Sequence, residues 1–199
     1  MKNTLKISLE IQKFAKLQSG VFSLSDLINI IFPKNKAALY RALSQIIEAG
    51  ILKQFCRGIY VTNDFDIKVL SQRICPSSYI SFGTVLSDAL IIGSMPKYRL
   101  MAVKLGKTST YADKRYTINH LGITKSLFKG FKNENGINIA TPEKAFIDTL
   151  YFYKKGTKFS FDIYTDIDID ALDKDLINNY LKEYRDKKFV SFVRRLIHE

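Results

Sequence analysis

"FPKNKAALYRALSQIIEAGILKQFCRGIYV", which runs from Phe32 to Val61, is the stretch of sequence that decides the predicted fold. Its first half has the pattern of a helix. Asn35 can accept a hydrogen bond from an early backbone N–H as N-cap residue, and Gly50 can take the left-handed conformation that closes the other end. Between them, apolar side chains recur with the spacing i, i+4, i+7 and i+8. We expect these to form one core-facing stripe: Leu39, Leu43, Ile46 and Ile47.

The second half of the stretch predicts a β-hairpin. An extended run begins at Ile51, reverses at Cys56-Arg57-Gly58 and returns as Ile59-Tyr60-Val61. Gly58 can supply any positive φ that the turn requires.

Two earlier helices complete this pattern. In residues 4–17 the apolar side chains alternate as in a strand but also follow a helical stripe, and we choose the helix. Ser23 or Ser25 can cap a second short helix, which extends up to Pro33. Three short helices followed by a hairpin predict a winged helix-turn-helix, which we place at residues 1–66.

The side of the third helix opposite its apolar stripe is polar and basic, which suits a nucleic acid. The major groove of B-DNA admits one α-helix, and the N-terminal residues of that helix reach the base edges. Arg41 can offer a bidentate fork to guanine, lysines can neutralise phosphates, and Arg57 at the hairpin turn would meet phosphate or the minor groove. The predicted DNA contacts are Lys34, Asn35, Lys36, Tyr40, Arg41, Ser44, Gln45, Lys53 and Arg57.

Composition agrees with a polyanionic partner in a reducing compartment. Lys and Arg number 31 against 19 Asp and Glu, which gives a net charge of +12. The segment from Met1 to Thr62 carries nine of these cations and only three acids. Cys56 and Cys75 form no CxxC pair, and we expect ordinary thiols. No long apolar run and no secretory signal is recognised, so we expect a cytoplasmic protein that does not enter a membrane.

The region after residue 66 predicts a mixed α/β domain, placed at residues 67–199, so that the whole chain is of the α+β class. Residues 62–81 suggest a connection, and Ser81 can cap a helix that ends near Leu90. Antiparallel strands are expected up to Leu121, and a further strand after Gly136. Thr141 and Pro142 start a helix whose expected core-facing residues are Ala145, Phe146, Leu150 and Tyr153. Two basic, amphipathic helices are expected at the C-terminal end.

Chemistry-bearing groups in this region do not form a catalytic pattern. Asp166, Asp168 and Asp170 would share one side of a strand and could hold a divalent cation, but the spacing fails the calcium-loop pattern. We interpret them as a solvated edge or a helix-capping loop. His120 is interpreted as a surface group, because it has no partner in sequence. We therefore predict no enzyme activity, no catalytic residues, no metal and no cofactor.

Three motifs together resemble the AbiEi family of antitoxins over nearly the whole chain. They are RGIYV (Arg57–Val61), PSSYIS (Pro76–Ser81) and ATPEKAFIDTLY (Ala140–Tyr151), of which the last is the most specific. The residues onto which the family motif maps are Gly58, Tyr60, Pro76, Tyr79, Ser81, Thr141, Pro142, Glu143, Lys144 and Asp148.

The resemblance implies an antitoxin of a type IV toxin-antitoxin system that serves phage defence. The winged helix would repress the chain's own operon at inverted repeats of promoter DNA. The C-terminal domain would counteract a nucleotidyltransferase-like toxin without an obligatory stable complex and would assist repression. We expect a monomer in solution that can pair on DNA. The alternative is a protein-docking adaptor that binds its toxin directly without sequence-specific DNA binding.

Overall fold

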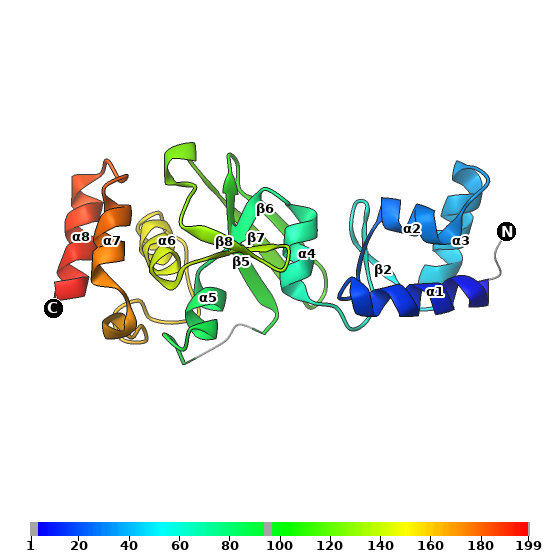
Figure 1. The fold of residues 1–199 in the computed structure, drawn as a ribbon, viewed down its shortest axis with the longest axis horizontal. Coiled ribbons are helices and arrows are strands. Elements are labelled where there is room, and N and C mark those ends of the chain that lie inside the picture. Colours follow the sequence, from blue (N-terminus) through cyan, green and yellow to red (C-terminus); the bar gives the residue numbers. More distant parts are fainter. Residues whose placement is uncertain (1–3, 94–96, 199) are drawn as a thin grey trace. The chain divides into compact units, whose positions relative to one another are not determined.

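The computed structural model describes residues 4–93 and 97–198, which form a mixed α+β fold (Figure 1). Contacts divide the chain into two compact units, Met1–Pro76 and Ser77–Glu199. The division therefore falls later than the boundary after residue 66 that the sequence suggests. The first unit contains α1 (Thr4–Leu17), β1 (Val21–Ser23), α2 (Leu24–Ile31), α3 (Lys36–Glu48), β2 (Lys53–Cys56), β3 (Ile59–Val61) and α4 (Ile67–Ile74).

Helix α1 settles the ambiguity between helix and strand in residues 4–17. Ile7 and Ile11 are buried, whereas Leu5 and Leu9 are 67% and 59% exposed. A strand would have placed all four on the same face, because side chains two residues apart share a face in a strand. The helix is confirmed by this division of its apolar residues between two sides.

The predicted cap of α2 is confirmed at Ser23 rather than Ser25. The Ser23 hydroxyl accepts the Asp26 N–H at 3.1 Å, and the Asp26 carboxylate accepts the Ser23 N–H at 2.8 Å. This reciprocal pair is a capping box, which satisfies two backbone donors at the start of the helix.

The hairpin of β2 and β3 belongs to a three-stranded antiparallel sheet of order β1-β3-β2, so the two-stranded prediction was incomplete. Strand β1 has three residues, too few for an alternating pattern to be visible in the sequence. It pairs with β3 from Val21 opposite Val61 to Ser23 opposite Ile59. The Leu24 N–H donates to the Gly58 carbonyl at 2.8 Å, which ties the hairpin turn to the start of α2.

Helix α4 occupies part of the stretch expected to be a connection, so that expectation was wrong. The Asp66 carboxylate caps it by accepting the N–H groups of Lys68 and Val69. The Arg73 guanidinium on α4 donates to the Asp26 carboxylate on α2 at 2.9 Å. This ion pair and the packing of α4 against β1 place the helix in the first unit, which explains the later boundary.

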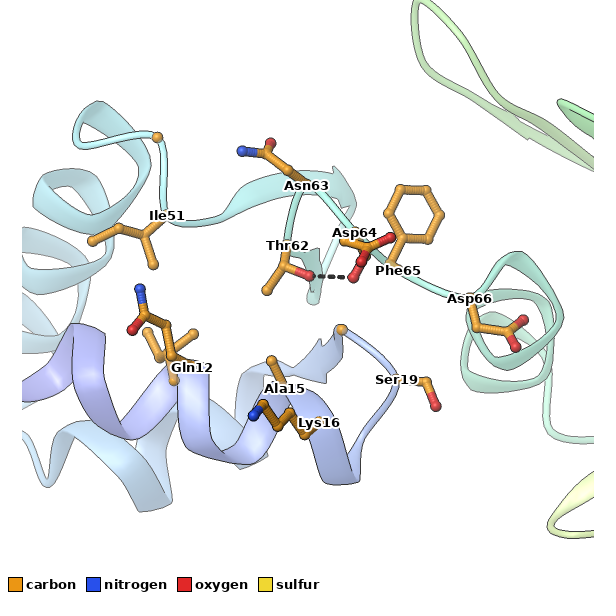
Figure 2. A pocket seen from close by; sticks show the side chains of 13 residues that line it. Gln12, Ala15, Lys16, Ser19, Ile51, Thr62, Asn63, Asp64, Phe65 and Asp66 are labelled. Carbon is orange, nitrogen blue, oxygen red and sulfur yellow. Dashed lines mark hydrogen bonds between the residues drawn. The ribbon is translucent and has the colours of Figure 1, made fainter.

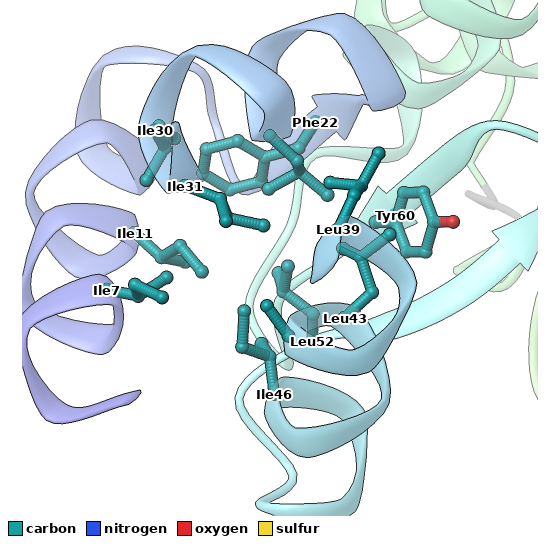
Figure 3. Packing of buried hydrophobic residues seen from close by; sticks show 12 residues of the cluster. Ile7, Ile11, Phe22, Ile30, Ile31, Leu39, Leu43, Ile46, Leu52 and Tyr60 are labelled. Atoms are coloured by element: carbon teal, nitrogen blue, oxygen red, sulfur yellow. The ribbon is translucent and has the colours of Figure 1, made fainter. Parts of the chain in front are cut away.

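The core of the first unit is apolar and lies between its helices and its sheet (Figure 3). Ile11, Phe22 and Ile46 are fully buried there, and Leu43 and Tyr60 are nearly so. Each large apolar side chain removed from water contributes about 1.5–3 kcal/mol. This core fixes which side of α3 faces solvent.

The second unit is built on a six-stranded sheet of order β6-β7-β5-β4-β9-β8. Helix α6 packs against β9, α5, α7 and α8 (Figure 1). The elements are β4 (Ser78–Ile80), α5 (Gly83–Asp88), β5 (Arg99–Leu105), β6 (Ser109–Ala112), β7 (Thr117–Ile123), the 3-10 turn Lys125–Leu127, β8 (Phe131–Glu134), β9 (Ile137–Ala140), α6 (Pro142–Lys154), the 3-10 turn Ile169–Ala171, α7 (Lys174–Leu181) and α8 (Lys187–His198).

The sheet is mixed, not antiparallel as expected, because β7 lies between β5 and β6 and runs parallel to β5. The connection after β5 passes directly over Gly122 of β7. A Cβ atom at Gly122 would lie 1.8 Å from the Gly106 carbonyl oxygen, so only glycine permits this crossing. No local sequence pattern reveals such a close approach.

Two residues of the second unit were predicted to cap helices, and only one of them does. Thr141 caps α6, as predicted, by accepting the Lys144 N–H at 3.2 Å, with Pro142 in the first turn. Ser81 does not cap α5: Phe82 holds that position, and the helix ends at Asp88. On α6 the expected core residues are buried except Tyr153, which is 40% exposed.

The interpretation of His120 as a surface group was also wrong, whereas the three aspartates lie exposed in a loop, one of the two interpretations that the sequence left open. His120 is fully buried on β7, with its ring 5.8 Å from that of Tyr111, and is not a surface group. Asp166, Asp168 and Asp170 lie in turns and a short 3-10 helix rather than along a strand. The Asp166 carboxylate accepts the Asp162 N–H at 2.8 Å, so it stabilises its own loop.

Candidate nucleic-acid interface

Helix α3 has one buried side and one exposed side, which its sequence determines. The Asn35 side chain accepts the Ala38 N–H at 2.9 Å, and Gly50 follows the helix with φ +69°. Leu39, Leu43 and Ile46 are buried, as predicted, together with Ala42. Ile47 is 36% exposed and lies at the edge of this stripe.

The opposite side of α3 is polar and accessible. Its first turn is preceded by Lys34 and begins with Lys36, and both are exposed. Tyr40, Arg41 and Ser44 are exposed on the following turns at a spacing that keeps them on one side of the helix. The structure therefore brings these predicted contact residues onto one continuous surface.

The remaining predicted contacts are less uniform. The Gln45 side chain accepts a hydrogen bond from the Thr4 hydroxyl at 3.3 Å, so it turns toward the start of α1. Lys53 on β2 is partly buried, with its ammonium 5.7 Å from the centre of the Phe65 ring. Arg57 is exposed in the turn between β2 and β3. Gln45 and Lys53 thus already have partners within the first unit.

Phe32, between α2 and α3, is a further exposed residue that the contact prediction left out. It ends α2 with a left-handed backbone, at φ 51° and ψ 58°, and its N–H donates to the Ile28 carbonyl at 2.9 Å. Its side chain is 72% exposed. In the sequence, Phe32 follows the apolar stripe of α2 and precedes Pro33, and this position does not show whether its side chain is buried or exposed.

An open groove of about 910 Å³ lies elsewhere in the first unit, between the second half of α1 and the segment after β3 (Figure 2). Ala15 and Phe65 contribute apolar parts of its lining, and Lys16 and Asp64 contribute charged parts. The Thr62 hydroxyl donates to the Asp64 carbonyl at 2.8 Å (Figure 2). None of the nine predicted DNA contacts lines the groove, so the two surfaces are distinct.

Four motif residues of the second unit meet in its core. The Asp148 carboxylate accepts hydrogen bonds from the Tyr79 hydroxyl at 3.0 Å and the Ser81 hydroxyl at 2.9 Å, and it forms an ion pair with Lys144 one turn earlier on α6. The Lys144 ammonium also lies 3.4 Å from the Tyr184 hydroxyl. We call Tyr79, Ser81, Lys144, Asp148 and Tyr184 the buried polar cluster.

The electrostatics of the buried polar cluster follow from its isolation from water. Burial raises the pKa of Asp148, while the Lys144 ammonium and the hydroxyl donors act in the opposite direction. Burial and the neighbouring Asp148 carboxylate both raise the pKa of Tyr79, and the same two causes raise that of Tyr184, so both hydroxyls remain neutral. The cluster therefore ties α6 to β4, and its members are at most 9% exposed.

The sequence contained only part of this cluster's signal. Lys144 and Asp148 stand four residues apart, which predicts the same side of a helix. Tyr79 and Ser81 stand two residues apart, as do residues that share one face of a strand. The sequence does not show that this face packs against the side of a distant helix that carries Lys144 and Asp148. Tyr184 was not among the motif residues at all.

Two further findings concern metal binding and membranes. Among residues 4–93 and 97–198, no three His, Cys, Asp or Glu side chains are placed to hold a metal ion. Within the same described residues, no helix is long and apolar enough to span a membrane.

No protein-family model matches the chain, and no curated protein matches it. Function therefore has to follow from the geometry and from the sequence motifs.

Proposed function

We propose that the first unit is a winged helix-turn-helix that binds double-stranded DNA and represses its own operon. The order α1, β1, α2, α3, β2, β3 and the small antiparallel sheet support this class. In such a domain α3 enters the major groove, and the turn that carries Arg57 is the wing tip.

The observation that carries this proposal is the division of α3 into a buried apolar side and an exposed polar side. Lys34 and Lys36 stand at the N-terminal end, where a recognition helix meets DNA, and Arg41 follows on the exposed side. Lysines there can neutralise phosphates, and an arginine can bond guanine through two N–H groups. The fold of the first unit does not require these charges, because its core is apolar.

We propose further that the chain is an AbiEi-like antitoxin whose second unit counteracts a nucleotidyltransferase-like toxin in the cytoplasm. The support is the resemblance of the three motifs and the convergence of Tyr79, Ser81, Lys144 and Asp148 in the buried polar cluster. The two chains on an inverted repeat would each contribute one first unit, and a stable complex with the toxin is not required.

The alternative, a protein-docking adaptor, draws on a different surface. Three leucines of α1, Leu5, Leu9 and Leu17, are 67%, 59% and 77% exposed. Exposed apolar side chains on one helix are typical of a protein contact, although Lys6, Lys13 and Lys16 lie between them.

The deciding experiment compares promoter DNA of the chain's own operon with a random duplex of equal length. Besides Arg41, which is assigned to guanine, four predicted contacts are Lys or Arg, so raising salt fourfold should weaken binding by about 150-fold if these four meet phosphate. Equal affinity for the two duplexes would refute self-repression, and stable capture of the toxin together with that result would establish the adaptor. Rescue of cells that express the neighbouring nucleotidyltransferase-like gene tests the antitoxin role separately.

A further inference from the structure

Phe32 combines a left-handed backbone with an exposed aromatic side chain. Its φ of 51° lies in the region that favours glycine and asparagine and strains a bulky residue. The following Pro33 restricts its backbone further. With 72% of the residue exposed, most of the apolar ring surface stays in water.

Two other residues with a positive φ show what is unusual about Phe32. Phe82 has φ 62°, but it is fully buried, and its ring lies 5.6 Å from that of Phe152. Burial offsets the strain there. Leu90 has φ 59° and is 87% exposed, so like Phe32 it combines backbone strain with an apolar side chain in water. It stands in the second unit, after α5. Leu90 is therefore a matched control for the backbone strain and the exposure of Phe32.

The position of Phe32 suggests what its ring meets. The hydrogen bond to the Ile28 carbonyl and the proline ring hold the backbone on both sides of Phe32. Lys34, Asn35 and Lys36 follow at once, and these begin the surface assigned to DNA. The apolar group that base pairs expose in the major groove is the thymine methyl, and phenylalanine is one of the side chains that contact it.

We propose that Phe32 is a specificity residue that packs its ring on a thymine methyl group at the edge of the site contacted by α3. This assignment rests on the proposed function of the first unit. Phe32 would add an apolar base contact, from a position before α3, to the polar contacts of Arg41 and Ser44. The left-handed backbone is the conformational cost of presenting the ring there.

The test replaces each thymine of the promoter fragment in turn by deoxyuridine, which removes only the methyl group. Dissociation constants are measured for the full chain and for Phe32→Asn, Phe32→Tyr and Leu90→Asn. At one thymine, the wild type, Phe32→Tyr and Leu90→Asn should each lose affinity by about fourfold, the effect of one methyl group. Phe32→Asn should bind the unmodified fragment more weakly and show no loss at that position.

Folding is checked by thermal unfolding of the same four proteins. Asparagine tolerates the left-handed region, so Phe32→Asn and Leu90→Asn should each raise the unfolding midpoint of their unit, by roughly 4–8 °C if about 1 kcal/mol of strain is relieved.

The outcomes separate the two proposals. If the wild type prefers the promoter fragment but Phe32→Asn keeps the same deoxyuridine profile, Phe32 does not contact a thymine methyl, while DNA binding stands. If the wild type binds promoter and random duplexes equally, the proposed function fails and the assignment of Phe32 fails with it.

Discussion

The two units of this protein place their charged residues in opposite environments. Among the described residues of the first unit, no Asp, Glu, Lys or Arg side chain is buried, and its core is apolar. The second unit buries an ammonium and a carboxylate, Lys144 and Asp148, and gives the carboxylate two hydroxyl donors. Charges of the first unit therefore lie at its surface, whereas those of the buried polar cluster are used within the fold.

This difference changes the meaning of the sequence motifs. The segment that carries the strongest family resemblance, around Lys144 and Asp148, has a sufficient explanation in the hydrogen bonding that ties α6 to β4. The lysines and arginines around α3 have no such explanation in the fold. A polyanionic partner explains them better than stability does.

The largest expected effect is that of Asp148→Ala on the second unit. The change leaves the Lys144 ammonium buried without a counter-charge and removes the acceptor of Tyr79 and Ser81. Breaking one side of a buried pair costs about 3–5 kcal/mol of unfolding free energy, which denaturant titration would measure.

The control for this prediction is Asp170→Ala. Asp170 also pairs with a lysine one turn away, Lys174, at 3.0 Å, but its side chain is 92% exposed. Exposed pairs of this kind contribute about 0.5 kcal/mol or less. Equal losses in the two variants would contradict the distinction between buried and surface charge.

The next effect concerns the exposed charges of the first unit. Arg41→Ala should cost about 1–3 kcal/mol of DNA binding and relax the preference at one base pair. Lys36→Ala should weaken binding to all sequences alike and reduce the salt slope by about one. Both variants should unfold like the wild type, within about 0.5 kcal/mol. Identical binding behaviour of the two would reject the assignment of base and phosphate roles.

Asn35 has a smaller and divided role, since its side-chain oxygen already caps α3. Asn35→Ala should lower the stability of the first unit by about 1 kcal/mol, because the Ala38 N–H loses its acceptor. Asn35→Asp keeps the cap and adds a negative charge beside Lys34 and Lys36, so it should weaken DNA binding without the loss of stability. Calorimetry and binding assays on both variants separate the two roles. An equal loss of stability in Asn35→Asp would show that loss of the cap does not explain the lower stability of Asn35→Ala.

The smallest effect is expected for the ion pair between Arg73 and Asp26. Both side chains are partly exposed, at 36% and 24%, and pairs in such settings contribute about 0–1 kcal/mol. Asp26 also belongs to the capping box of α2, so a double-mutant cycle is needed to isolate the coupling with Arg73. A coupling that appears in unfolding of the first unit would support its extension to Pro76, and a coupling of zero would show that α4 is held by packing alone.

Local signals in the sequence determined helices α1, α2, α3 and α6. The bounds of α1 and the caps at Ser23, Asn35 and Thr141 follow from hydrogen bonds and apolar spacings that span a few residues, which a linear pattern records. The exposed side of α3 follows in the same way, because burial of one helical stripe leaves the other in water.

Tertiary structure alone decided the features that join distant residues. Strand β1 has only three residues, too few for a recognisable pattern, and it is held by pairing with β3. Helix α4, which the sequence analysis took for a connection, is held by its ion pair to α2. The parallel pairing of β5 and β7 depends on one close approach at Gly122. The buried polar cluster forms only where a strand and a helix bring their polar residues together. No local sequence pattern records this, because the hydrogen bonds of the cluster gain their strength only when water is excluded from the strand and the helix together.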